Sequence, residues 1–164
     1  MKGQFDRFVI RFLAVLLLGL ALMTLRGYGV LAVFTPRYAS PWELGKLLYW
    51  PMLTVFSLTA KWSGGWKKAL NSAAPAILLA PLALMLCCWA VQPVRPAAGV
   101  FVLLWMIASA VGTALADQEQ RHSALWLVLV LVEGALLVVL TFWPPLFGPF
   151  LNPNHTAAIN MISQ

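Results

Sequence analysis

One acidic residue lies in a stretch of sequence that hydrocarbon would be expected to surround. Glu133 stands in the middle of L-W-L-V-L-V-L-V-E-G-A-L-L-V-V-L, with apolar residues on both sides. A charge near the middle of a bilayer costs at least about 2.5–3.5 kcal/mol, so such residues usually face the protein interior and often mark a function. Burial away from a cation favours the neutral, protonated form of a carboxyl group. The position predicts a site for an ion, a proton or a ligand, or else a buried structural hydrogen bond.

The order of the apolar segments predicts the neighbours of Glu133. Segments 97–116 and 124–143 are separated by a short polar run, so we expect them to pack antiparallel. Ser109 then lies at the depth of Glu133, and Thr113 lies one helical turn closer to the inner face. Small residues that permit close helix contact recur at every fourth position: Ala108, Gly112 and Ala116. Three interpretations stay open, namely a Glu133–Ser109 hydrogen bond, an ion, proton or ligand site, and a contact with another subunit.

Arg26 is the candidate counter-charge for Glu133. If the first apolar segment ends near Leu25, Arg26 lies at the outer edge of the membrane and its side chain extends to water. If the segment continues to Phe34, Arg26 is buried and can approach Glu133. The sequence leaves both arrangements open.

A second group of charged residues begins another apolar segment. Ser40-Pro41-Trp42-Glu43 matches the capping box S-x-x-E, in which the Ser40 hydroxyl accepts a hydrogen bond from the Glu43 amide. Pro41 falls at the first helical position, where its missing N–H costs nothing. Lys46 can pair with Glu43 one turn earlier, with its ammonium group reaching water at the outer boundary. The alternative is an outward-facing binding site made by Trp42, Glu43 and Lys46.

The composition places these residues in a membrane protein. Of the 164 residues, 62% are apolar and 10% are charged, whereas soluble domains are roughly 45–50% apolar and about 25% charged. The net charge of +6 comes from basic residues at segment ends. This distribution argues against a nucleic acid partner and for contacts with the lipid bilayer. The adjacent Cys87 and Cys88 have neither a metal-binding nor a redox spacing, and we interpret them as two small apolar residues.

Five apolar segments are long enough to cross a membrane, which takes about 20 helical residues each. We predict a single domain, an all-α integral membrane bundle of five transmembrane helices, with an irregular tail over 144–164. The predicted spans cover about 8–30, 42–60, 69–91, 97–116 and 124–143. Pro51, Pro75 and Pro81 fall inside the second and third spans. Each proline removes one backbone hydrogen bond, and Pro51 thereby frees the Leu47 carbonyl for another donor.

The basic residues also predict the orientation in the membrane. Seven Lys and Arg residues lie on the face that holds the N-terminus and four lie on the other face, and the richer face is normally cytoplasmic. We therefore predict a protein of the bacterial inner membrane with a cytoplasmic N-terminus and an external C-terminus. Tryptophans near the segment ends are expected at headgroup depth, with Trp62, Trp66 and Trp126 at the inner face.

The segment W-E-L-G-K-L-L-Y-W-P-M-L resembles a stretch of a family of small, mostly bacterial, multi-pass membrane proteins known only as a domain of unknown function. The matching residues are Ser40, Trp42, Glu43, Lys46 and Pro51, together with T-F-W-P-P at 141–145 and a later N-P. Leu44 stands where the family has a histidine, and Tyr38-Ala39 stands where it has Asn-Glu. The resemblance implies a multi-helix membrane fold, and it implies no activity.

The sequence shows no recognisable catalytic constellation. His122 lies in a polar loop and His155 in the tail, on opposite faces of the predicted topology, and there is no phosphate-binding loop. We therefore predict a non-enzymatic protein with no cofactor and no metal. Two functional hypotheses follow. One is a protein that binds or transports a small solute, a proton or a lipid at Glu133, and the other is a scaffold or partner subunit of a membrane complex.

Overall fold

A computed structural model describes residues 2–25, 29–36, 40–91, 98–116, 118 and 124–143 of the chain. These residues form five α-helices and two short 3-10 helices, and no strand occurs among them. In chain order the elements are α1 (Lys2–Thr24), η1 (Gly29–Val33), α2 (Pro41–Leu58), η2 (Ala60–Ser63), α3 (Trp66–Val91), α4 (Ala98–Ala116) and α5 (Ala124–Phe142). The predicted all-α bundle of five helices is confirmed.

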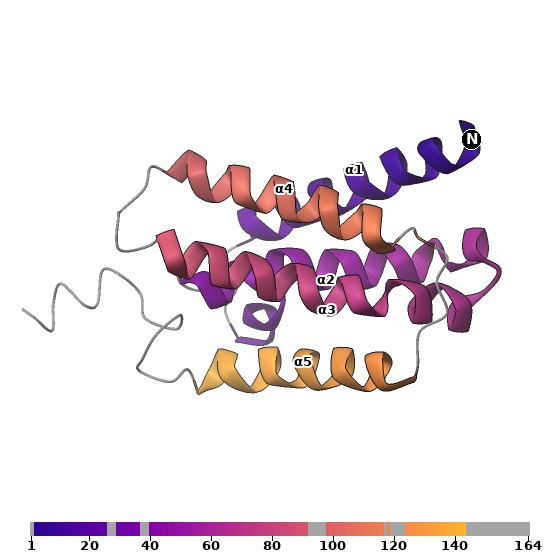
Figure 1. The fold of residues 1–164 in the computed structure, drawn as a ribbon. Helices are drawn as coiled ribbons and strands as arrows, with labels where there is room; N and C mark the ends of the chain where they lie inside the picture. Colours follow the sequence, from indigo (N-terminus) through magenta and orange to yellow (C-terminus); the bar gives the residue numbers. More distant parts are fainter. Residues whose placement is uncertain are drawn as a thin grey trace, which may run out of the picture.

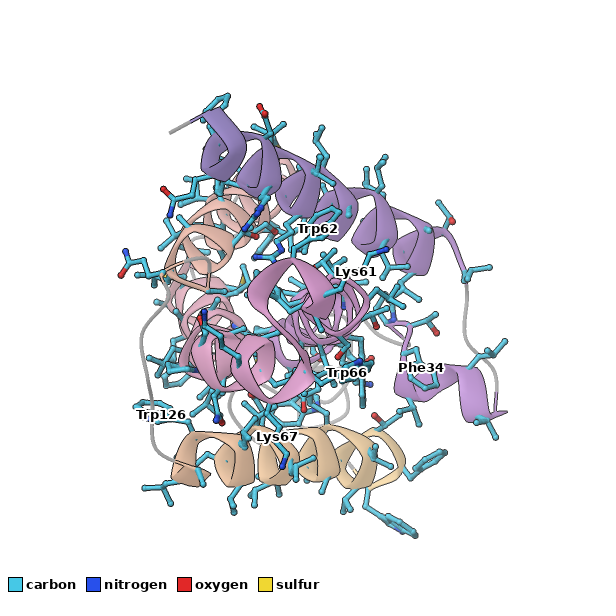
Figure 2. The ribbon with its side chains drawn as sticks, turned by 90° about the vertical axis from the view of Figure 1, so that its right-hand side faces the viewer. Phe34, Lys61, Trp62, Trp66, Lys67 and Trp126 are labelled. Carbon is cyan, nitrogen blue, oxygen red and sulfur yellow. The ribbon has the colours of Figure 1, made fainter. Side chains whose placement is uncertain are left out.

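Each α-helix runs roughly antiparallel to the α-helix before it, and α2 and α3 occupy the middle of the bundle (Figure 1). The α1 and α4 helices lie on one side of this central pair, and α5 packs against α3 on the other side (Figures 1 and 2). The start of α1 and the end of α5 therefore lie at opposite ends of the bundle. This order places α3 between α4 and α5.

Four of the five α-helices are long and apolar enough to cross a membrane, which is consistent with a multi-pass membrane protein. The four candidate spans are Gly3–Thr24, Trp66–Val91, Gly99–Ala116 and Ala124–Phe142. Their outward faces expose large apolar side chains, such as Leu17 on α1 at 67% and Leu131 on α5 at 71%. Such faces suit contact with lipid, because the hydrogen bonds of a helix backbone are satisfied within the helix.

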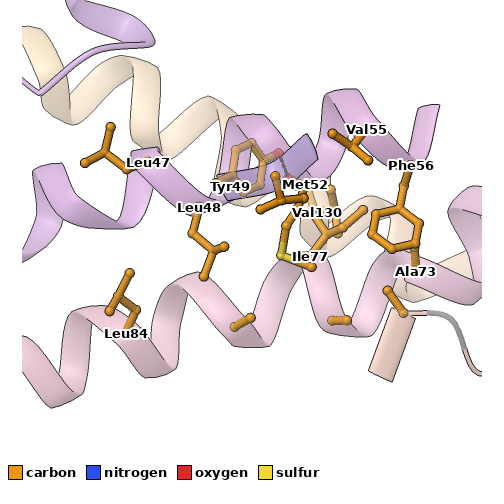
Figure 3. Packing of buried hydrophobic residues seen from close by; sticks show 14 of the residues in the cluster. Leu47, Leu48, Tyr49, Met52, Val55, Phe56, Ala73, Ile77, Leu84 and Val130 are labelled. Atoms are coloured by element: carbon orange, nitrogen blue, oxygen red, sulfur yellow. Dashed lines mark hydrogen bonds between the residues drawn. The ribbon is translucent and has the colours of Figure 1, made fainter. Parts of the chain in front are cut away.

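The α2 helix is the one α-helix of the described residues that is not among the four candidate spans, and it lies in the middle of the bundle. Its first turns carry Glu43 and Lys46, and twelve of its residues are buried. Tyr49, Met52 and Phe56 of α2 pack with Ile77 of α3 in the centre of the apolar core (Figure 3). Because so little of α2 faces outward, it does not need the continuous apolar surface that the outer helices present.

The observed helix ends differ most from the predicted spans in the first helix. It covers Lys2–Thr24 rather than 8–30, since Arg7 and Arg11 continue the helix and contact the end of α2 and η2 instead of preceding the helix. The last two residues of that predicted span, Gly29 and Val30, belong to η1, a separate 3-10 helix. The other four helices begin and end within three residues of the predicted spans, and the tail over 144–164 lies outside the described residues.

The carbonyl that Pro51 frees has a partner from another helix. Pro51 lies inside α2, and the indole Nε1 of Trp105 on α4 donates to the Leu47 carbonyl over 3.2 Å. Gly19 of α1 makes room for this contact, because a Cβ atom there would lie 2.9 Å from the Leu47 oxygen and closer still to the Trp105 ring. The bond joins α2 to α4, and α1 packs against it at Gly19. A backbone carbonyl freed in lipid is expected to find such a donor.

Replacing Trp105 by Phe is expected to lower the free energy of unfolding by about 1–3 kcal/mol, because the buried Leu47 carbonyl loses its donor. The cost should fall in a Pro51→Ala background, since the backbone amide restored at position 51 can bond to the Leu47 carbonyl within α2. Unfolding of the four proteins of this double-mutant cycle by a denaturing detergent measures both effects. Equal costs of Trp105→Phe in the two backgrounds would contradict the assignment, because any cavity left by the smaller ring is common to both.

Candidate functional site

The Glu133 side chain lies inside the bundle, on the part of α5 that faces α2. It is 5% exposed, and neither of its carboxylate oxygens has a hydrogen-bond partner among the described residues. Buried polar side chains are nearly always paired, so each exception in a native protein calls for a physical explanation. Glu133 is therefore the residue around which we build the candidate site.

Tyr49 of α2 is a buried neighbour of Glu133. Its ring is buried, its hydroxyl donates to the Val130 carbonyl over 2.7 Å, and it is close enough to Glu133 for an electrostatic interaction. Gly134 permits this approach, because a Cβ atom at that position would lie 2.5 Å from the Tyr49 oxygen. The Tyr49 phenol thus contacts both Val130 and Gly134 and holds this part of α5 against α2.

The predicted hydrogen bond between Glu133 and Ser109 is wrong. The Ser109 hydroxyl donates to the Trp105 carbonyl of its own helix over 2.7 Å, and α3 lies between α4 and α5 (Figure 1). A short connection between two helices does not force them into contact when a third helix offers a better packing surface. Thr113 is also fully buried on α4, and its hydroxyl has no partner among the described residues.

The small residues of α4 explain why this helix packs on α3. A Cβ atom at Gly112 would lie 2.8 Å from Ala80 of α3 and 3.2 Å from the Met52 methyl group of α2. The surface built from Ala108, Gly112 and Ala116 thus faces the central helix pair. The small-residue pattern predicts close packing correctly but does not identify the partner helix.

The start of α2 is capped as predicted, but its charges are placed differently. Ser40 is the N-cap, and its hydroxyl accepts from the Glu43 amide over 3.3 Å. The Lys46 ammonium group is fully buried rather than extended to water, and Glu43 and Trp42 are buried beside it. Lys46 Nζ donates to the two Glu43 oxygens over 2.8 and 2.9 Å and to the Ala32 carbonyl over 3.2 Å.

The η1 helix is the reason that this pair is shielded from solvent. Its Val33 carbonyl accepts from Trp50 Nε1 over 2.9 Å, and the Phe34 ring packs against Trp50 with the ring centroids 5.1 Å apart. Together with the bond from Lys46 to Ala32, these contacts hold η1 over the first turns of α2. Hydropathy alone assigns a lysine near a helix end to water, because it contains no information about a folded-back segment.

Sequence reasoning also missed the second buried cation. Arg11 of α1 is 3% exposed, donates to the Thr59 hydroxyl over 2.9 Å and lies 4.8 Å above the centre of the Phe56 ring. Arg11 is one of the seven basic residues that the sequence assigns to the face holding the N-terminus. Arg11 lies four residues after Arg7, so both side chains lie on the same face of α1. This spacing is the sequence signal that both could contact a neighbouring helix.

The structure therefore divides the predicted site residues into separate groups. Trp42, Glu43 and Lys46 lie together, Glu133 lies with Tyr49, Ser109 and Thr113 lie on α4, and Arg26 lies outside the described residues. Among the residues described, no group of three or more His, Cys, Asp or Glu could hold a metal ion. Cys87 and Cys88 both carry free thiols, and Cys88 packs in the apolar core.

Comparisons with known proteins found no relative of this chain. No protein-family model matches the chain, and neither the curated proteins nor the solved structures give a match. The resemblance to the family of small multi-pass membrane proteins stays a prediction.

Replacing Lys46 by Met is expected to destabilise the protein by about 3–5 kcal/mol, because it leaves the Glu43 carboxylate buried without its cation. The double variant Glu43→Gln/Lys46→Met should recover most of this loss, since no unpaired charge then remains. Lys67→Met, at an exposed position, is the matched control and should change stability by less than about 0.5 kcal/mol. Detergent-induced unfolding of the four proteins makes the comparison. A double variant as unstable as Lys46→Met would show that the pair is not the cause.

Proposed function

We propose that this chain is a non-enzymatic, multi-pass protein of the bacterial inner membrane that binds a proton or a small cation at Glu133 and carries it across the membrane. The unpaired carboxyl group of Glu133 is the observation that supports this proposal most strongly. Leaving a buried acceptor unpaired costs about 1–3 kcal/mol, and more when the group is charged. A bound proton or cation removes that cost, because it satisfies the oxygens directly.

The hydrogen bonding around Glu133 supports the same choice. The only hydroxyl proton of Tyr49 is donated to the Val130 carbonyl, so the phenol can accept a hydrogen bond from a protonated Glu133 but cannot donate one to it. Lys46 is engaged by Glu43 and by the Ala32 carbonyl. The described surroundings of Glu133 thus favour a ligand that brings its own positive charge or its own proton.

A partner subunit of a membrane complex is the second candidate function, and it has less support. Gly112 packs inside the bundle against Ala80 and Met52, so the small residues of α4 hold the bundle together and offer no contact surface to a partner. The outer face of α1 exposes Leu13, Leu17 and other apolar side chains. Lipid covers such a face as well as a protein does, so the face does not favour a partner.

The Glu133→Gln variant tests the proposed site, because it keeps the shape of the side chain and removes the titratable group. Protein is reconstituted into vesicles containing a pH-sensitive dye, and the decay of an imposed pH difference is followed in sodium and in potassium salts. We expect wild-type protein and the control Ser109→Ala to speed the decay, and Glu133→Gln to return it to the rate of protein-free vesicles. Equal decay rates for folded Glu133→Gln and wild type would contradict the proposal.

The proposed orientation is tested with fusions at Gln164, the C-terminal residue. Alkaline phosphatase fused there should be active, since it matures only outside the inner membrane, and green fluorescent protein fused there should stay dark. This expectation holds if all five α-helices of the described residues cross the membrane, and it follows from the basic residues around the start of α1. A dark phosphatase fusion with a bright fluorescent fusion would reverse the orientation.

A further inference from the structure

The exposed charges of the bundle gather at one end. Among residues whose side chains are described, the exposed charged ones are Asp6, Arg7, Lys61, Lys67 and Lys68. They belong to the start of α1, to η2 and to the first turn of α3, and these elements meet at the end of the bundle that faces the viewer in Figure 2. We call Arg7, Lys61, Lys67 and Lys68 the basic collar. Asp6 is the one exposed carboxylate among the described side chains, so cations predominate in this described set.

The opposite end of the bundle carries no exposed charge among the described side chains. Leu25, Val30, Leu31 and Trp143 are exposed there, and the charges of Glu43 and Lys46 are buried and paired with each other. Among the described side chains, the exposed charges thus lie at one end of the folded bundle. A surface of one sign at one end attracts an oppositely charged layer at that end.

Tryptophans accompany the basic collar. Trp62, Trp66 and Trp126 lie at the same end as Lys61 and Lys67 (Figure 2), and Trp66 is 60% exposed. Indole rings favour the boundary between hydrocarbon and lipid headgroups, where their apolar body and polar N–H are both satisfied. The combination indicates that the collar lies at headgroup depth.

The backbone beneath the collar is held in place. Arg7 Nη1 donates to the Trp62 carbonyl over 3.0 Å, which ties α1 to η2. Gly64 and Gly65, with φ of +82° and +116°, make the reversal between η2 and α3, a conformation that residues with a Cβ atom rarely adopt. The Gly65 amide bonds to the Ala60 carbonyl over 3.0 Å and closes this turn. Lys61 on η2 and the Lys67–Lys68 pair on the first turn of α3 therefore lie on either side of a hydrogen-bonded turn.

We propose that the basic collar binds the phosphate groups of anionic phospholipids in the leaflet that it faces. Lysine and arginine side chains near a membrane surface gain energy from net negative lipids and very little from zwitterionic ones. An arginine already fixed through one nitrogen keeps other N–H groups that can donate to a phosphate. The proposal concerns the collar alone, so it does not depend on any ligand at Glu133.

The test compares how spin-labelled phosphatidylglycerol and spin-labelled phosphatidylcholine associate with the protein in phosphatidylcholine membranes. The variants are Lys61→Gln/Lys67→Gln/Lys68→Gln and the charge-preserving control Lys61→Arg/Lys67→Arg/Lys68→Arg. Wild type and the arginine control should prefer the anionic lipid, and the preference should weaken up to about 5-fold for each lysine replaced by Gln. Raising the ionic strength should weaken it as well, because salt screens exposed charges.

Two results would overturn the proposal. One is a wild-type protein that binds the two labelled lipids equally at low salt. The other is a folded glutamine variant with the same preference as the arginine control. If the glutamine variant does not fold, the salt dependence of wild type and of the arginine control decides, and a preference that salt does not change counts against the collar. Glu133→Gln should keep the full lipid preference, which separates this proposal from the one about Glu133.

Discussion

Polar contacts made by α2 connect the other parts of this bundle. Lys46 and Trp50 donate to η1, the Leu47 carbonyl accepts from Trp105 of α4, Tyr49 donates to Val130 of α5, and Thr59 at the end of α2 accepts from Arg11 of α1. With α3, α2 packs through apolar contacts, and Gly45 lies directly against Met85. Two helices in lipid have little hydrophobic drive to associate, so hydrogen bonds and close packing must hold them together. The central α2 helix meets that requirement, because it combines apolar core contacts with hydrogen bonds to its neighbours.

Glu133 stands out against this arrangement. The α2 contacts pair a buried donor with a buried acceptor, whereas the Glu133 oxygens accept from no described residue. Tyr49, which interacts electrostatically with Glu133, donates its hydroxyl proton to the Val130 carbonyl and has no further proton to donate. Among the described residues, the unpaired carboxyl group of Glu133 supports the proposed ligand at that position. Removal of the charge should then affect binding more than folding.

Sequence patterns predicted the features that depend on a few neighbouring residues. The five helices, the Ser40 cap and the carbonyl freed by Pro51 all follow from local chemistry, since apolar length, capping and proline geometry act within a few turns. The choice of neighbours could not be predicted in this way, because α4 and α5, which carry Ser109 and Glu133, lie on opposite sides of α3. Close approaches at Gly112 and Gly134 help determine which helices pack together. The position of a glycine in the sequence does not indicate which residue packs against it. The burial of Lys46 depends on η1, which apolar length does not distinguish from the end of a transmembrane helix.

The most direct test of the central claim is to measure distances from the Glu133 carboxyl carbon to side-chain nitrogens. Protein labelled with ¹³C in glutamate and ¹⁵N in lysine and arginine is suitable for solid-state NMR in lipid bilayers. Among the described residues, the structure predicts a close carboxyl–ammonium pair on α2, that of Glu43 with Lys46, and no lysine or arginine nitrogen bonded to Glu133. A short distance between Glu133 and any lysine or arginine nitrogen, including Arg26, would show a structural ion pair. It would contradict the assignment of Glu133 as a ligand site.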